Sequence, residues 1–196
     1  TLHDVGREGD VDYLVMELIE GDTLAGRLSK GPLPSAEMLK IGTQIADALE
    51  SVLPSDFDAA CNVIEGTLAP PIAPDGVAAP RDVANDGLAG WIVWPLGEFV
   101  ARRGVEHPER ALRAMHALTQ RLTAEWAIRP LIVAHPALVY KTLLAWTRDA
   151  SPHVRRLASE GSRPRLPWGL QLKALIADPS PTLPILKALQ DDESEY

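Results

Sequence analysis

The chain has 196 residues, a hydrophobic content of 46% and a formal net charge of −8 at pH 7. No apolar run approaches the ~20 residues of a membrane span, so the sequence predicts a soluble protein with one core or a short solenoid. The single cysteine, Cys61, excludes an internal disulfide and offers no metal-ligand spacing. It favours a reducing, cytoplasmic setting, and we expect a buried, unreactive thiol.

The charge is divided unevenly along the chain. Residues 1–104 carry 17 acidic and 7 basic side chains, whereas residues 105–190 carry 6 acidic and 12 basic side chains. The acidic tail, residues 191–196, restores a charge of −4. The overall acidity therefore does not exclude nucleic acid, because residues 105–190 can supply the basic face that phosphates require.

The first part of the chain predicts two short strands and then helices. Alternating apolar residues indicate strands at about 1–5 and 11–18, joined by a turn that contains glycine. Ser35 can cap a helix that runs through Glu50, because the apolar residues that follow fall at helical spacing. Another amphipathic helix is expected at about 55–68.

Residues 69–90 are rich in Pro, Gly and Asp and predict a loop. From Trp91 onward the apolar spacing predicts one helix after another. Prolines at positions 108, 136, 152 and 181 stand where first helical turns tolerate them. The expected helices lie at about 93–103, 108–122, 124–133, 136–148, 151–160, 169–177 and 181–190.

A repeat supports a solenoid built from these helices. The sequence DASPH, which begins at Asp149, aligns with DESEY, which begins at Asp192, and gives a period of 43 residues. HEAT-type helical pairs span ~40–47 residues. Such pairs cannot bury their apolar faces alone, so they stack into a curved superhelix whose concave side usually binds the ligand. We therefore expect a mainly α fold, a HEAT-like α-solenoid of three or so helical pairs.

Four stretches carry a resemblance to a known family. They are TAEWAIRP (123–130), SPHVRRLASEGSRPRLPW (151–168), DPSPTLPILKALQDDESEY (178–196) and, more weakly, WPLGEFVARRG (94–104). The chain from about residue 45 resembles the AlkC branch of the bacterial DNA alkylation-repair glycosylases, HEAT-repeat proteins related to AlkD. The resemblance implies a monomeric hydrolase that removes cationic bases such as N3-methyladenine from alkylated double-stranded DNA, with no metal, cofactor or membrane.

The beginning of the chain resembles a different family. YLVMELIEGDTL (13–24) and KGPLPSAEMLKIGTQIADALE (30–50) are similar to the hinge and following helices of bacterial serine/threonine protein kinases. The resemblance implies a vestigial nucleotide hinge at Met16, Glu17 and Ile19. The phosphate loop, the strand lysine and the catalytic and metal-binding motifs of kinases are not present in the sequence, so we do not expect phosphoryl transfer.

The two resemblances divide the chain into two expected domains. Residues 1–50 would be a kinase-like remnant of two strands, hinge and helices, and residues 51–196 an AlkC-like glycosylase segment. We expect a fragment or chimera, because a new helix should begin near Tyr196. Such enzymes carry a further carboxylate in the next repeat, so the site of this chain is expected to be incomplete.

The resemblance places Glu125 and Glu160 in the active site and Trp168 beside the alkylated base. A base alkylated at a ring nitrogen is cationic and leaves readily. The remaining demand is to stabilise positive charge on the sugar and to orient water, and carboxylates do both. An indole face attracts a cation by ~0.5–2 kcal/mol, which favours damaged bases.

Arginines around these residues are expected to contact the DNA backbone: Arg155, Arg156, Arg163 and Arg165. Each assignment has a competing interpretation. The two glutamates could form surface ion pairs with arginines nearby, the tryptophan could be a packing residue, and the arginines could be solvated. Two functions therefore stand beside the glycosylase: a non-catalytic HEAT scaffold that binds DNA or protein, and a remnant of a kinase fusion.

Overall fold

The computed structural model describes residues 2–8, 11–16, 35–74, 86–167 and 169–194. The chain divides into two compact units, Thr1–Leu39 and Lys40–Tyr196. In the first unit, β1 (Leu2–Glu8) pairs antiparallel with β2 (Val11–Met16). The two short strands expected from the sequence are therefore present. Glu17 and Ile19 of the expected hinge lie outside the described residues.

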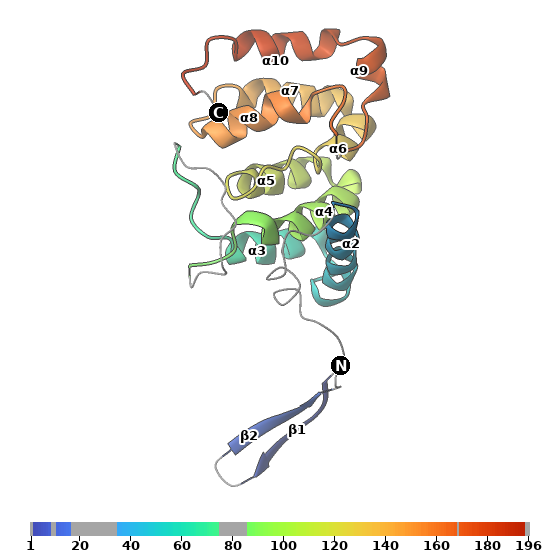
Figure 1. Cartoon of the computed structure of the whole chain (residues 1–196), viewed down its shortest axis with the longest axis vertical. Helices are drawn as coiled ribbons and strands as arrows, with labels where there is room; N and C mark the ends of the chain where they lie inside the picture. Colours follow the sequence, from blue (N-terminus) through green and yellow to red (C-terminus); the bar gives the residue numbers. More distant parts are fainter. Residues whose placement is uncertain (1, 9–10, 17–34, 75–85, 168, 195–196) are drawn as a thin grey trace. The chain divides into compact units, whose positions relative to one another are not determined.

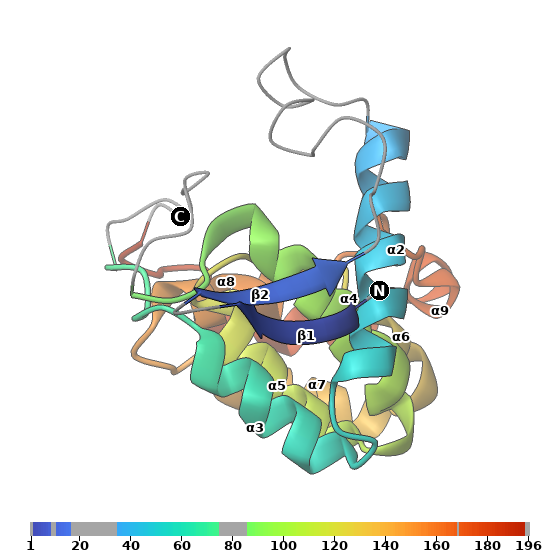
Figure 2. The ribbon, with the colours of Figure 1, turned by 90° about the horizontal axis from the view of Figure 1, so that it is seen from below.

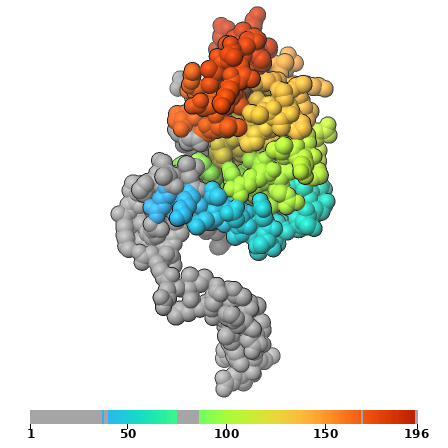
Figure 3. Space-filling model, turned by 90° about the vertical axis from the view of Figure 1, so that its right-hand side faces the viewer, coloured from blue at the N-terminus to red at the C-terminus, as the bar shows by residue number. Residues whose placement is uncertain are grey.

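The second unit is a stack of helices, and α2 (Ser35–Val52) spans the boundary between the two units. Figure 1 shows the helices following one another from α3 at one end to α10 at the other, and Figure 3 shows the same succession from the side. The elements after α2 are α3 (Phe57–Thr67), η1 (Gly90–Val93), α4 (Trp94–Arg103), η2 (Gly104–Glu106), α5 (Pro108–Thr119), α6 (Arg129–Ala134), α7 (Pro136–Trp146), α8 (Pro152–Gly161), α9 (Lys173–Ala177), η3 (Ser180–Thr182) and α10 (Leu183–Ala188).

The helices are arranged in two layers. Seen from below, α3, α5 and α7 lie on one side and α4 and α8 on the other (Figure 2). The core between them is apolar and includes Val100, Met115, Leu118, Leu143 and Leu157. The predicted fold class, a mainly helical solenoid, is confirmed. No helix in the described ranges combines the length and apolar character that crossing a bilayer requires.

Proline sets the start of many helices, as the sequence predicted. Pro108, Pro136 and Pro152 all stand in first turns. The expected helix at 124–133 is wrong in its first half, because α6 begins only at Arg129 and residues 125–128 form turns. A helix begun at 124 would place Pro130 in its interior, where the ring clashes with the preceding turn and a hydrogen bond is lost.

The buried thiol expected at Cys61 is present. Its side chain points from α3 into the apolar core and has no exposed surface. Burial raises the pKa of the Cys61 thiol to about 11. The thiol is therefore protonated at neutral pH and is a poor nucleophile.

The 43-residue repeat corresponds to a repeated local structure. The backbone N–H of Ser151 donates to Asp149 Oδ1 at 2.8 Å, and that of Ser194 donates to Asp192 Oδ1 at 2.9 Å. Each aspartate also binds a side chain from an earlier helix. Asp149 Oδ2 is 2.8 Å from His116 Nε2, and Asp192 binds Arg155. Each aspartate thus shapes the turn after a helix and ties that turn to an earlier helix.

Close packing at one glycine gives a first prediction. A β-carbon at Gly104 would overlap the β-carbon of Ala111 in α5, whereas one at Gly66 in α3 would meet no atom within 4 Å. We expect Gly104→Ala to lower the free energy of unfolding by about 1–3 kcal/mol, because an overfilled core strains its neighbours. Gly66→Ala should be neutral or stabilise by up to about 1 kcal/mol through helix propensity. Thermal unfolding followed by circular dichroism measures both, and equal melting temperatures would contradict the tight packing at Gly104.

Candidate active site

Glu125 lies in the turn segment between α5 and α6 and is only 2% exposed. The hydroxyl of Thr123 donates to its Oε2 at 3.3 Å, and Nη2 of Arg156 in α8 is 3.7 Å from the same oxygen. A buried carboxylate without such partners would be strongly destabilising. The two partners therefore hold this carboxylate where the turn segment meets α8.

Glu160 lies in the last turn of α8 and its side chain is 28% exposed. Nη1 of Arg163 donates to its Oε2 at 2.8 Å. This hydrogen bond raises the pKa of the Arg163 guanidinium, and the charge of Glu125 adds to the effect. One guanidinium thus responds to both carboxylates.

The structure therefore brings together four of the residues expected from the sequence. Arg156 and Glu160 stand one helical turn apart on α8, where side chains are neighbours. Arg156 is paired with Glu125, and Glu160 is paired with Arg163. We call the group Glu125, Arg156, Glu160 and Arg163 the carboxylate cluster. It combines two acids of different exposure with two cations, an arrangement that can stabilise positive charge and also bind an anion.

Arg129, the first residue of α6, binds the backbone of the segment that follows Glu160. It is fully buried, and its guanidinium donates to the backbone oxygens of Gly161 at 3.1 Å, Pro164 at 3.3 Å and, through Nε, Leu170. Burial lowers its pKa, and the charge of Glu125 opposes that change. Arg129 thus fixes the segment that follows Glu160.

The sequence marked Arg129 only as one of the nearby arginines with which the two glutamates could form surface ion pairs. Its acceptors are backbone carbonyls of residues 32 to 41 positions away along the chain. No side-chain pattern marks such acceptors. Thr123 was missed as well, although it lies only two residues from the carboxylate to which it donates. A charged residue inside the apolar run of 124–132 was the available signal, because a buried arginine needs several acceptors.

The other expected residues are placed differently. Arg155 points to Asp192, with hydrogen bonds of 2.6 and 2.9 Å, and also donates to the carbonyl of Asp149 at 3.0 Å. It joins α8 to the chain after α10 and is not part of the cluster. Arg165 is exposed in the turn after α8. Trp168, expected beside the base, lies outside the described residues.

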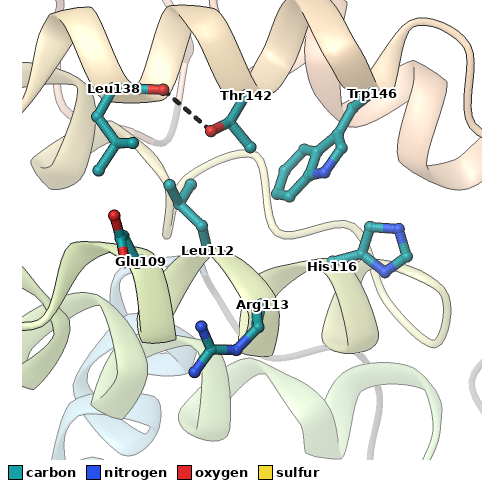
Figure 4. A pocket seen from close by; sticks show the side chains of 7 residues that line it. All are labelled: Glu109, Leu112, Arg113, His116, Leu138, Thr142 and Trp146. Carbon is teal, nitrogen blue, oxygen red and sulfur yellow. Dashed lines mark hydrogen bonds between the residues drawn. The ribbon is translucent and has the colours of Figure 1, made fainter.

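A pocket of about 560 Å³ opens elsewhere, between α5 and α7 (Figure 4). It is lined by Glu109, Leu112, Arg113, His116, Leu138, Thr142 and Trp146, and no member of the carboxylate cluster lines it. His116 is held at its edge by Asp149 and by an edge contact with the Trp146 ring. The pocket is thus separate from the chemistry expected of the cluster. Within the described ranges, no group of three or more His, Cys, Asp or Glu side chains is placed to hold a metal ion.

The pairing of Arg155 with Asp192 gives a second prediction. The hydrogen bond from Arg155 holds the pKa of Asp192 below its ordinary value. The stabilisation is therefore complete above pH ~4, the pKa of an unfolded aspartate, and is lost as the pH falls through the lower folded pKa.

We expect Asp192→Asn to lower the free energy of unfolding by about 1–2 kcal/mol at pH 7, because a charge-assisted pair is weakened. The difference from the parent protein should disappear below that pH window. Denaturant unfolding between pH 2 and 7 measures it, with Asp191→Asn at the exposed neighbouring position as the control. A difference that persisted unchanged at pH 2 would contradict the ion pair.

No protein-family model matches the chain. Among curated proteins, the uncharacterized protein YhaZ of Bacillus subtilis is 48% identical over 118 residues, which is 59% of this chain and 32% of YhaZ. A probable serine/threonine-protein kinase of Clostridium perfringens is 46% identical over 48 residues, which is 24% of this chain and 7% of the kinase. The resemblance to kinases is thus confined to a short segment and does not support kinase activity.

Among solved structures, the chain is similar to the alkylpurine DNA glycosylase AlkC of Pseudomonas fluorescens, solved bound to DNA that contains an abasic-site analogue. The match has a TM-score of 0.67 and 30% sequence identity, and it covers 81% of this chain and 40% of the glycosylase. The chain therefore spans about a third of YhaZ and two fifths of the glycosylase. Over most of its own length, this chain has an AlkC-like helical solenoid fold and is similar in sequence to an alkylpurine DNA glycosylase.

Proposed function

We propose that the chain belongs to a DNA N-glycosylase that excises cationic N-alkylated bases such as N3-methyladenine. The observation that carries the proposal is the carboxylate cluster, in which a nearly buried carboxylate, Glu125, is paired with Arg156 and a partly exposed one, Glu160, is paired with Arg163. The similar Pseudomonas protein was solved with an abasic-site analogue, which resembles the product of base excision. The proposal concerns residues 40–196, which form the helical unit.

The reaction places modest demands on the protein. The bond between C1′ of the sugar and the base nitrogen breaks, and the cationic base leaves neutral because it takes the bonding electrons. Positive charge develops on the sugar until the oxygen of water bonds to C1′ and the water gives up a proton. Carboxylates stabilise that charge and accept that proton.

The two carboxylates suit different parts of this reaction. Glu125 is buried and held by Thr123 and Arg156, so its charge is fixed in position and suits electrostatic stabilisation of the sugar. Glu160 is more exposed and suits orientation and deprotonation of water. In this proposal Trp168 lies against the base, an expectation that stays a prediction.

In this proposal the arginines of the cluster contact the DNA backbone. Arg163 is 54% exposed and bound to Glu160. When DNA binds, its guanidinium can exchange the carboxylate for a phosphate, since both accept charge-assisted hydrogen bonds from arginine. The exchange would leave Glu160 available to water at the moment when the substrate is in place. Arg156 and Arg165 would add backbone contacts, whereas Arg155 is committed to Asp192.

Base release tests the catalytic part of the proposal. The full-length gene product should release N3-methyladenine from methylated duplex DNA, and Glu125→Gln and Glu160→Gln should each slow release by ~10²-fold or more, as expected for groups that assist proton transfer or stabilise charge. Glu109→Gln, at an exposed position on α5, is the matched control and should leave the rate unchanged. Release is measured by chromatography of the freed base under single-turnover conditions. A protein that bound DNA but released no base would instead be the non-catalytic scaffold.

Salt dependence tests the DNA-binding part. Each phosphate contact releases counterions, so the affinity for DNA should fall steeply with salt concentration. Arg163→Ala should reduce the slope of log K against log salt by about 1. Arg113→Ala, an arginine 65% exposed on the other layer of helices, should leave that slope unchanged. Fluorescence anisotropy with a labelled duplex measures the slopes, and affinity independent of salt would overturn the proposed face.

A further inference from the structure

Three tryptophans form a continuous stack in the second unit. The rings of Trp91 in η1 and Trp94 in α4 are 5.7 Å apart between centroids and inclined by 18°. The rings of Trp94 and Trp126 are 4.2 Å apart and inclined by 19°. This is the offset, nearly parallel geometry that aromatic pairs favour. Because Trp126 follows Glu125 directly, the inner end of the stack lies in the segment that carries the buried carboxylate.

The stack is closed at one end and open at the other. Trp126 is 9% exposed, Trp94 is half-buried and Trp91 is 48% exposed. The inner ring packs against α4, where a β-carbon at Gly97 would lie 3.1 Å from Trp126 Cζ2. The indole N–H of Trp126 is buried and has no hydrogen-bond acceptor among the described residues. Ring contacts therefore hold this indole in place, at the cost of an unsatisfied donor.

Packing in the core does not account for the outer ring of the stack, that of Trp91. Trp91 does not belong to the buried core cluster, and the neighbouring Ile92 is 39% exposed as well. The helix that follows Trp91, α4, lies in the same layer as α8, which carries Arg156 and Glu160 (Figure 2). A half-exposed indole therefore precedes a helix of the layer that carries Arg156, one of the candidate phosphate contacts.

We propose that the outer face of Trp91 is a stacking surface for an unpaired nucleobase of the bound DNA. The inference rests on the proposed function and adds to it a second contact, apart from the carboxylate cluster. A nucleobase has the planar π face that would extend the indole stack by one ring. Stacking of this kind tolerates any base sequence. Removal of the aromatic ring weakens binding by ~1–3 kcal/mol, which corresponds to about 5- to 150-fold.

Salt distinguishes this contact from the arginine contacts. Stacking neutralises no phosphate and releases no counterion. Removal of Trp91 should therefore weaken binding by the same factor at every salt concentration, whereas removal of Arg163 should change the slope. The two variants separate the stacking surface from the electrostatic face in one series of titrations.

The experiment measures the affinity of the full-length gene product for a duplex with an abasic-site analogue, an intact duplex and a single strand, each end-labelled and titrated at four salt concentrations. Trp91→Ala should weaken binding of the abasic duplex and the single strand about tenfold, with a smaller effect on the intact duplex, whose bases are already stacked. Trp91→Phe keeps a ring and should bind within about threefold of the parent protein. Leu186→Ala, on α10 and also 48% exposed in the parent, should bind like the parent.

The failures are distinguishable. If the parent protein binds none of these DNAs, the proposed function fails and this inference fails with it. If Trp91→Ala binds the abasic duplex and the single strand as tightly as Leu186→Ala does, DNA binding stands and the stacking surface is overturned. The inference is also overturned if Trp91→Ala changes only the oligomeric state measured by light scattering, because the ring would then contact another protein. Circular dichroism melts of all three variants establish that they are folded.

Discussion

The guanidinium of Arg129 joins the two segments that carry the candidate carboxylates. Arg129 begins α6 directly after the turn segment that contains Glu125. Within the described residues its guanidinium donates to the backbone oxygen of Gly161, which ends α8, and to those of Pro164 and Leu170 in the irregular segment that follows. Carbonyls in irregular structure need donors once they are buried, and a buried guanidinium needs several acceptors. Each side thus satisfies the other, and this interaction, together with the ion pair between Arg156 and Glu125, ties the segment that carries Glu125 to the segment that carries Glu160.

The arginines of the basic half divide into internal clamps and surface contacts. Arg110 is nearly buried and holds Asp58 and Glu65 of α3 against α5, and Arg155 holds Asp192 in the same way. These charges are neutralised within the fold and are not available to phosphates. The basic surplus of residues 105–190 therefore overstates the charge that faces a ligand. That charge comes from exposed cations such as Arg165 and Arg163, although Arg163 is bound to Glu160.

Much of the helical pattern could be predicted because its determinants are local. Apolar spacing and prolines in first turns depend on residues within a few positions of one another, and α4, α5, α7 and α8 begin within one residue of the expected starts. The helix expected at 124–133 begins too early because the apolar spacing continues across Pro130. That proline stands in the first turn of α6 and not in the interior of a longer helix. Glu125 is therefore held by a turn segment against α8 and does not project from a helix.

The sequence alone determined the helical class, the 43-residue period and the identity of the acidic and basic side chains that meet in the cluster. Only the tertiary structure decided which arginine meets which acceptor. Arg155 and Arg156 are adjacent in sequence, yet they point about 100° apart on a helix, so one reaches Asp192 and the other Glu125. The same holds for the tryptophan stack, because rings 32 positions apart in sequence come into contact only when η1, α4 and the turn after α5 pack together. Contacts over such separations depend on how the layers pack, and no local pattern encodes that packing.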